Sequence, residues 1–384
     1  MVPCQNTREW SHIQTVKRRK ILILCIDAGS HDYLAASHLP TLQKLAKAGF
    51  YRHANAVIPS VTNVNNVSIA TGTFPETHGI TTNYHVDRTT GRGEFIEDNR
   101  FLLAPTLFET AKASKFADQT ALFVTKKKLL RMLETGTDIA VAAEDPPSEY
   151  IPIVGQVEPI YSIEINWWLL RAVQETLRKD DPELVYCSTT DWVQHKYAPD
   201  AEPAQRHFAV LDQIISEIVD DDPEREIYIT ADHGMLAKTT ALDPGRLLTE
   251  HGIPADAIPI IKDRYVAHHS NLGGAAYVFL KNRADTPKAV KKLLCTPGIE
   301  EAYCAEDAAR TFRLHSERIG DIFVLADETT VFGELETAVE PTDVRSHGSR
   351  HESYVPIIGY NSPWSATDFE YNLDIGRLFL ESLL

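Results

Sequence analysis

A regular alternation of short apolar runs and helical patterns is the feature that most constrains how this chain folds. The run Lys20–Ile26 is apolar after its first residue, as expected for a strand buried on both faces. The helical pattern Pro40–Ala48 follows and ends at Gly49, a residue typical of helix ends. Similar strand-like runs recur at Thr120–Val124 and Leu184–Ser188. The alternation predicts an α/β fold with a mostly parallel central sheet flanked by helices.

The same pattern continues through most of the chain and is interrupted once. Residues 20–234 and 346–384 form the predicted core, and residues 235–345 form a smaller α+β cap inserted into it. Residues 1–19 are predicted to be an N-terminal extension. The core also has predicted strands at Ile227–Thr230 and Val355–Ile358, and predicted helices at Lys126–Glu134, Asn166–Arg178, Glu202–Val219 and Leu373–Leu384. In the cap we expect strands at Gly273–Leu280 and Gly320–Ala326, and helices at Pro287–Leu294 and Ala305–Phe312.

Composition excludes two classes of partner. The chain carries 38 basic and 54 acidic residues, a net charge of −16, whereas a nucleic-acid-binding protein needs a basic face. No apolar run approaches the roughly 18 residues that span a bilayer, and the polar N-terminus lacks the apolar segment of a signal peptide. The 5 scattered cysteines contain no CxxC pair, which indicates reduced thiols and a cytoplasmic protein. A homodimer is compatible with the sequence, which does not determine the oligomeric state.

Acidic residues follow three of the predicted core strands. Asp27 and Asp232 come directly after their strands, and Asp191 comes after a short turn. Because ligands bind along the carboxyl edge of an open parallel sheet, we expect these carboxylates to lie together at a functional edge.

Histidines accompany these carboxylates. His195 lies four residues after Asp191, His233 is adjacent to Asp232, and His347 lies where the core resumes. Imidazole and carboxylate are the ligands of zinc and similar cations. Any one of these residues alone is more typical of a helix cap or an ordinary structural histidine. Their occurrence together at strand ends favours a metal site.

A hydroxyl group at the start of an expected helix is the candidate nucleophile. The segment IPSVTNVNNVSIATG, residues 58–72, places Thr62 where an extended stretch turns into a helix. Backbone N–H groups and the positive helix end favour an anion there. A threonine hydroxyl attacks only when a base or a metal activates it. The alternative is that Thr62 is an N-cap that satisfies those N–H groups.

Together these segments resemble the alkaline phosphatase superfamily, within it the nucleotide pyrophosphatase/phosphodiesterase branch. The stretch PSVTNVNNVSIATG, followed by HGITTNY, is most similar to phosphonoacetate hydrolases. The resemblance covers the predicted core in the order of the family. The matching segments are IDAG (26–29), PSVTN (59–63), ATG (70–72), PETHGI (75–80) with Asn83, DWVQH (191–195), ADHGM (231–235) and SHG (346–348).

The resemblance implies a site with two Zn²⁺ ions. It assigns the first ion to Asp27, Thr62, Asp232 and His233, and the second to Asp191, His195 and His347. It implies that Thr62 attacks phosphorus and that Asn83 donates a hydrogen bond to a phosphoryl oxygen. His351 is the alternative to His347 as a ligand.

Lysines are predicted to bind the negative charge that the substrate carries beyond its phosphoryl group. Three aspartates and a threonine alkoxide balance two Zn²⁺ ions, so a further anionic group needs further cations. The run Lys126–Lys128 opens a helix after a strand, where cations oppose the helix dipole, so a functional role is favoured over a solvated turn. Phosphonoacetate hydrolases carry a similar lysine pair, which we match to Lys126 and Lys128, although this stretch is one residue shorter than theirs. Lys238 resembles another lysine on the substrate side.

The resemblance therefore implies hydrolysis of the carbon–phosphorus bond of phosphonoacetate to acetate and phosphate through a phosphothreonine intermediate. The alternative on the same core is a phosphodiesterase or nucleotide pyrophosphatase, and an alternative of another class is a binding protein without catalysis. In either enzyme the partner is a small anionic phosphonate or phosphoester. The pair His268 and His269 could line the pocket, but its place on a predicted loop favours a structural role.

Overall fold

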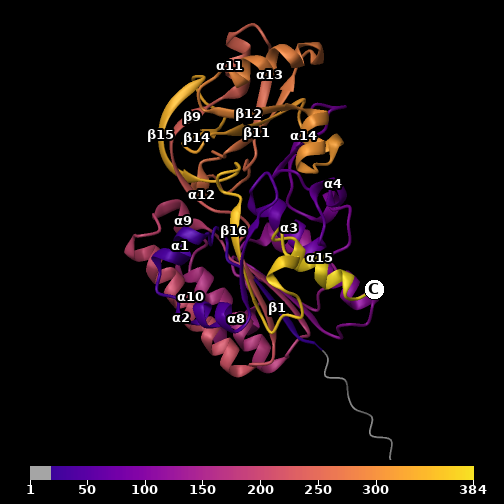
Figure 1. Ribbon diagram of the computed structural model, residues 1–384, viewed down its shortest axis with the longest axis vertical. Helices are drawn as coiled ribbons and strands as arrows, with labels where there is room; N and C mark the ends of the chain where they lie inside the picture. Colours follow the sequence, from indigo (N-terminus) through magenta and orange to yellow (C-terminus); the bar gives the residue numbers. More distant parts are fainter. Residues whose placement is uncertain (1–18) are drawn as a thin grey trace, which may run out of the picture.

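The computed structural model describes residues 19–384, which form a core and an inserted part above it (Figure 1). A seven-stranded sheet lies at the centre of the core, in the order β2-β16-β8-β1-β7-β5-β6. The strands from β8 to β6 pair in parallel, and β16 pairs antiparallel with β8 and with β2. The strands are β1 (Ile21–Cys25), β2 (Phe50–Asn55), β5 (Thr120–Val124), β6 (Ile139–Ala142), β7 (Leu184–Ser188), β8 (Glu226–Thr230) and β16 (Tyr354–Tyr360). The prediction of a mostly parallel α/β sheet is confirmed.

Helices cover both faces of this sheet because its central strands are apolar on both sides. Alternate residues of β1 belong to two different apolar clusters: Ile23 packs with the α3 and α15 side, and Leu24 with the α2, α8 and α10 side. Figure 1 shows these two helical layers on opposite sides of β1 and β16. The core helices are α1 (His31–Ala36), α2 (Pro40–Ala48), α3 (Thr62–Thr71), α4 (Pro75–His78), α5 (Leu107–Ala113), α6 (Lys127–Leu133), α7 (Ile151–Val154), α8 (Glu164–Lys179), α9 (Trp192–Lys196), α10 (Glu202–Asp221) and α15 (Asp374–Glu381).

The inserted part has its own sheets and its own apolar cluster. A four-stranded sheet, β10-β11-β13-β12, and a three-stranded sheet, β14-β9-β15, lie wholly between Leu236 and Ser346. Their strands are β9 (Leu236–Leu242), β10 (Ala255–Pro259), β11 (Ala275–Leu280), β12 (Ile299–Cys304), β13 (Ile322–Ala326), β14 (Thr330–Phe332) and β15 (Val339–Ser346). The helices are α11 (Pro244–Glu250), α12 (Val266–His269), α13 (Thr286–Leu294) and α14 (Ala305–Phe312). A small hairpin of the core, β3 (Tyr84–Val86) and β4 (Gly93–Phe95), completes the sheets.

The predicted helices and strands agree with most of the observed element boundaries. Gly49 follows a helix as predicted, but glycine is required there for a different reason. Gly49 follows α2 as expected, but its φ of −115° is not the left-handed conformation of a glycine helix end. A Cβ at Gly49 would lie 1.9 Å from the backbone oxygen of Gly359 on β16. Glycine is therefore required there by the close approach of a neighbouring strand.

Three further expectations from the sequence concern the N-terminal extension, the cysteines and membrane-spanning helices. The predicted N-terminal extension, with Cys4, lies almost entirely outside the described residues. The cysteines that are described are free thiols. Between residues 19 and 384, none of the helices combines the length and the apolar character that crossing a membrane requires.

The close contact between α3 and α15 predicts that the stability of the protein is sensitive to substitution of Gly376, a residue of α15. A Cβ at Gly376 would lie 1.9 Å from the backbone oxygen of Ile69. We expect Gly376→Ala to lower the free energy of unfolding by roughly 1–3 kcal/mol, because the two helices must separate. Chemical denaturation checks this, with the exposed Glu381→Ala on the same helix as a control that changes stability by no more than about 0.5 kcal/mol. Equal stabilities of the two variants would contradict the tight contact.

Candidate active site

Three carboxylates converge at the carboxyl edge of the central sheet. Asp27 follows β1, Asp191 follows the turn after β7, and Asp232 follows β8, which are neighbouring strands in the sheet. All three side chains are buried. The parallel strands therefore bring together acidic residues that are separated by more than 200 positions in the sequence.

Three histidines, His195, His233 and His347, lie beside these carboxylates, and the Nδ1 atom of each ring points away from them. The Nδ1 atom of His195 lies 2.7 Å from the oxygen of Arg345, that of His233 lies 2.9 Å from the oxygen of Gly234, and that of His347 lies 2.9 Å from the oxygen of Ser60. A carbonyl oxygen only accepts hydrogen bonds, so each Nδ1 donates. A ring with its proton on Nδ1 carries the Nε2 lone pair on the other side, where a ligand can bind, which is the usual arrangement of metal-binding histidines.

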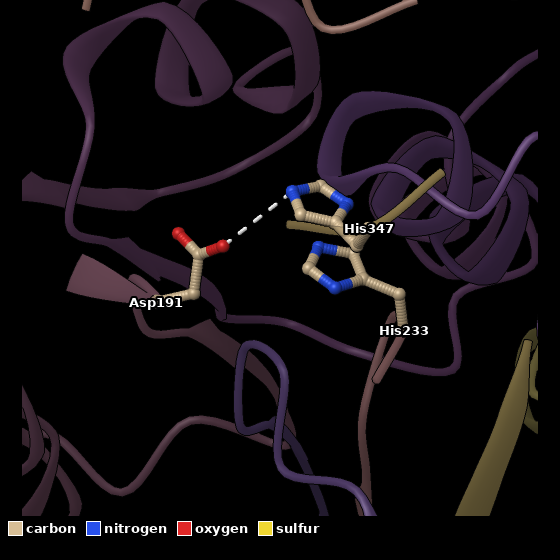
Figure 2. A group of neighbouring side chains, drawn as sticks. All are labelled: Asp191, His233 and His347. Atoms are coloured by element: carbon tan, nitrogen blue, oxygen red, sulfur yellow. Dashed lines mark ion pairs between the residues drawn. The ribbon is translucent and has the colours of Figure 1, made fainter. Parts of the chain in front are cut away.

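These side chains form overlapping groups that could each hold a cation. Ligand atoms lie within 4.8 Å of one another in the groups Asp27, Asp232 and His233; Asp191, His233 and His347; and Asp191, His195 and His268. The Nε2 atom of His195 lies 3.0 Å from Asp191, and that of His347 lies 3.6 Å from the same carboxylate. Figure 2 shows the rings of His233 and His347 stacked beside Asp191, with centroids 3.5 Å apart.

The donor set fits a metal cation for an electrostatic reason. Neither carboxylate oxygen of Asp27 has a hydrogen-bond partner, although both are buried. Burial and the neighbouring Asp191 and Asp232 raise the pKa of Asp27 well above its ordinary value. A cation between these groups removes that conflict. Burial also lowers the pKa of His347 well below its ordinary value, so this ring is neutral and its Nε2 is available as a ligand.

Asp232 is held in place by neutral donors. The backbone N–H groups of Ala28 and His233 donate to one of its oxygens, at 3.2 and 3.1 Å. Asn66 donates to the other at 3.1 Å and itself accepts a hydrogen bond of 2.7 Å from the hydroxyl of Tyr186. These contacts fix the orientation of the carboxylate without adding charge.

Thr62 lies at the start of α3 and does not cap it. The cap position is Val61, and no side chain caps this helix. The hydroxyl oxygen of Thr62 lies 3.2 Å from Nε2 of His233. The interpretation of Thr62 as a structural N-cap is therefore wrong, and its hydroxyl faces the metal-ligand group instead.

A closed pocket beside Thr62 gathers the predicted substrate contacts. Its volume is about 10 Å³, and its lining includes Thr62, Asn83, Lys126 and Lys128 together with groups of the inserted part. This space holds about one water molecule. Lys126 has an extended backbone at the start of α6, so side chains two positions apart point the same way. Lys126 and Lys128 are accordingly buried, whereas Lys127 between them is more exposed and pairs with Asp145.

Two predicted residues lie elsewhere. Lys238 does not line this pocket: it is completely buried, with its ammonium 2.6 Å from Glu352 and 2.9 Å from the backbone oxygen of Glu328. Its role as a substrate contact is not supported, because a buried carboxylate already neutralises it. His351, the alternative ligand, points away to an ion pair with Glu300 in the inserted part.

Two histidines that we favoured as structural lie at the site. The Nε2 atom of His268 lies 2.6 Å from Asp191, and that of His269 lies 3.1 Å from Asp263, whose carboxylate also pairs with Lys128. Both histidines belong to α12. The sequence signal was present as two adjacent histidines, but nothing in their spacing linked them to a strand end.

Comparisons with known proteins agree with this geometry. The family model described as type I phosphodiesterase / nucleotide pyrophosphatase matches residues 21–350. Human bis(5′-adenosyl)-triphosphatase ENPP4 is 26% identical over 324 residues, which is 80% of this chain and 65% of that protein. An uncharacterized pyrophosphatase/phosphodiesterase of Schizosaccharomyces pombe is 25% identical over 235 residues, 56% of this chain and 44% of that one. The chain thus spans about half to two thirds of the length of these relatives.

Solved structures include a more similar molecule. Phosphonoacetate hydrolase from Sinorhizobium meliloti 1021, in complex with phosphonoformate or with phosphonoacetate, superposes with a TM-score of 0.86 at 30% identity and covers 96% of both chains. Murine ectonucleotide pyrophosphatase/phosphodiesterase 5 superposes with a TM-score of 0.67 at 18% identity, and this likeness shows the fold.

The ligand groups predict a loss of metal in histidine variants. We expect His195→Ala and His347→Ala to lower the divalent metal content after dialysis, because each removes an inward-facing Nε2. Elemental analysis measures this content. His351→Ala is the matched control and should retain the metal of the unaltered protein. A loss in the control equal to that in His347→Ala would contradict the assignment of ligands.

Proposed function

Because the chain belongs to the type I phosphodiesterase / nucleotide pyrophosphatase family, we propose that it hydrolyses the carbon–phosphorus bond of phosphonoacetate to acetate and phosphate. The observation that carries the proposal is the pair of buried lysines, Lys126 and Lys128, in a closed pocket beside Thr62. The similar phosphonoacetate hydrolase bound to phosphonoacetate supports the same substrate.

The pocket suits a small dianionic ligand better than a nucleotide. No Phe, Tyr or Trp is among the described residues that line it, and the Tyr265 ring, 5.3 Å from the ammonium groups of Lys126 and Lys128, is already in contact with these two cations. Lys126 has no ion-pair partner among residues 19–384, so its buried ammonium is available to an anionic group of a substrate. A carboxylate on the leaving group supplies that anion.

In the proposed reaction the Thr62 oxygen attacks phosphorus and the carbon–phosphorus bond breaks. The electron pair of that bond passes to the carbon, where the adjacent carboxylate shares it as an enolate. Lys126 and Lys128 stabilise the developing charge, and a proton from solvent then gives acetate. Asn83 donates to a phosphoryl oxygen. Water hydrolyses the phosphothreonine, which releases phosphate and restores the Thr62 hydroxyl.

The ligand groups would hold two Zn²⁺ ions in this proposal. Asp27, Thr62, Asp232 and His233 would hold one, as the group Asp27, Asp232 and His233 supports. Asp191, His195 and His347 would hold the other, and Asp191 forms one compact group with His347 and another with His195. Bound there, the ions supply positive charge for the phosphoryl oxygens and lower the pKa of the nucleophile. The chain's own contribution is the tautomer of each imidazole, which a backbone carbonyl fixes.

Substitution of the nucleophile tests the mechanism. We expect Thr62→Ala to lower kcat on phosphonoacetate by several orders of magnitude, because the attacking oxygen is gone. Thr62→Ser keeps the hydroxyl and should retain measurable activity. Elemental analysis and circular dichroism check that fold and metal survive in both variants. Turnover by the alanine variant near the rate of the unaltered enzyme would mean that water attacks phosphorus directly.

The lysines test the substrate class. We expect Lys126→Ala and Lys128→Ala to lower kcat/KM for phosphonoacetate about tenfold to about a hundredfold, because each removes a charge-assisted contact of roughly 1.5–3 kcal/mol. The loss for an uncharged aryl phosphodiester should be much smaller. Lys127→Ala, in the same run but more exposed, is the matched control. Equal losses on both substrates would favour the phosphodiesterase activity for which the relatives are named.

A further inference from the structure

The Asp263 carboxylate contacts Lys128 and Asn83, two residues that the proposed function assigns to the substrate. The Asp263 side chain is 4% exposed and pairs with the ammonium of Lys128. The same carboxylate oxygen lies 3.5 Å from the side-chain nitrogen of Asn83. Two core residues predicted to hold substrate therefore face an acidic residue of the inserted part.

The segment that carries Asp263 is built to hold this carboxylate in place. Residues 261–272, which we call the gate segment, join β10 to β11 and include α12, at the border of the two parts in Figure 1. The other oxygen of Asp263 accepts a hydrogen bond of 2.7 Å from the backbone N–H of Tyr265 and lies 3.1 Å from Nε2 of His269. Its own N–H donates to the side chain of Asn271 at 3.1 Å. Asp263 is thus fixed within its segment.

The gate segment is also attached to the core at its outer side. The Tyr265 hydroxyl donates to Glu144 at 2.8 Å, and its ring lies 5.3 Å from the ammonium of Lys126 and from that of Lys128. Arg264 donates to Glu97 at 2.9 Å. These contacts close the pocket over both lysines.

The small size of the pocket and the Asp263 carboxylate on Lys128 together leave no room for a substrate carboxylate. The remaining space accommodates about one water molecule, whereas phosphonoacetate is several times larger than a water molecule. Asp263 offsets the burial of the Lys128 ammonium, so its removal leaves that charge without an ion-pair partner unless another anion takes its place. A ligand that brings a carboxylate can replace Asp263. A ligand without one must break the buried pair and leave Lys128 uncompensated.

We propose that Asp263 fills the place of the substrate's carboxylate in the free protein, and that substrate binds by displacing it from Lys128 and moving the gate segment outward. Asp263 is then a specificity-determining residue: the buried pair opens to a ligand that supplies an anion in exchange. This proposal rests on the proposed function in assigning Lys126 and Lys128 to a carboxylate, but it concerns binding and needs no turnover.

Ligand binding to Asp263→Asn tests the proposal. The amide keeps the size of the side chain and an oxygen for the Tyr265 N–H but removes the competing charge. By calorimetry on the full-length, metal-loaded protein, we expect acetate to bind about tenfold to about a hundredfold more tightly than to the unaltered protein. Methylphosphonate, which has no carboxylate, should change by no more than about twofold. The control is Asp256→Asn, which removes an exposed partner of Lys281 in the same part of the chain.

Three outcomes of these titrations would overturn the proposal. Unchanged or weaker acetate binding by Asp263→Asn would make Asp263 a permanent counter-ion of Lys128. An equal gain for methylphosphonate would place Asp263 on the phosphoryl side of the pocket. An equal gain for acetate in the Asp256→Asn control would make the effect one of overall charge.

A second measurement uses the unaltered protein and does not depend on the folding of a variant. Trypsin cleaves after Lys262 and Arg264, which flank Asp263 in the gate segment. We expect saturating acetate to increase cleavage at these two bonds severalfold, located by mass spectrometry, because the segment moves outward. Unchanged or slower cleavage would contradict the displacement. If acetate binding and cleavage behave as expected while phosphonoacetate is not hydrolysed, the displacement of Asp263 is supported and the proposed reaction is wrong.

Discussion

Burial of like charges at one sheet edge is the constraint on which the rest of this structure depends. Asp27, Asp191 and Asp232 follow neighbouring parallel strands and are withdrawn from water together. In a medium of low dielectric constant such a group is stable only with compensating positive charge and oriented donors. The amide of Asn66 and the backbone N–H groups around Asp232 supply the donors. The oxygens of Asp27 have no hydrogen-bond partner, and this carboxylate belongs with Asp232 and His233 to a group that could hold a cation.

The inserted part decides what can approach that edge. It contributes His268 to Asp191 and Asp263 to Lys128, so one short segment contacts both the metal-ligand group and the anion pocket. The family fold by itself permits substrates of different size. The pocket at that edge is small, and its lining includes the buried Lys126 and Lys128, which is why we propose a substrate whose leaving group carries a negative charge.

The lysine run illustrates how backbone geometry sorts identical residues. Lys126, Lys127 and Lys128 have the same chemistry, but they lie at the junction of a strand and a helix, where side chains still alternate. The first and third face the pocket, and the second faces solvent and Asp145. One run of three lysines thus places two ammonium groups at the pocket and one at the surface.

The sequence by itself determined the layered α/β fold and the core of the site. Buried strands, helix periodicity and residues at strand ends are local features, and parallel pairing brings strand ends to one edge whatever the loops do. Asp27, Asp191, His195, Asp232 and His233 could be named for that reason, whereas Thr62 stands out by its place at the start of an expected helix and His347 by its place where the core resumes. Only the tertiary structure decided the remaining contacts: that Lys238 is neutralised by Glu352, that His351 pairs with Glu300, and that Asp263, His268 and His269 reach the site. These depend on how the inserted part packs on the core, which no local pattern of charge or hydrophobicity encodes.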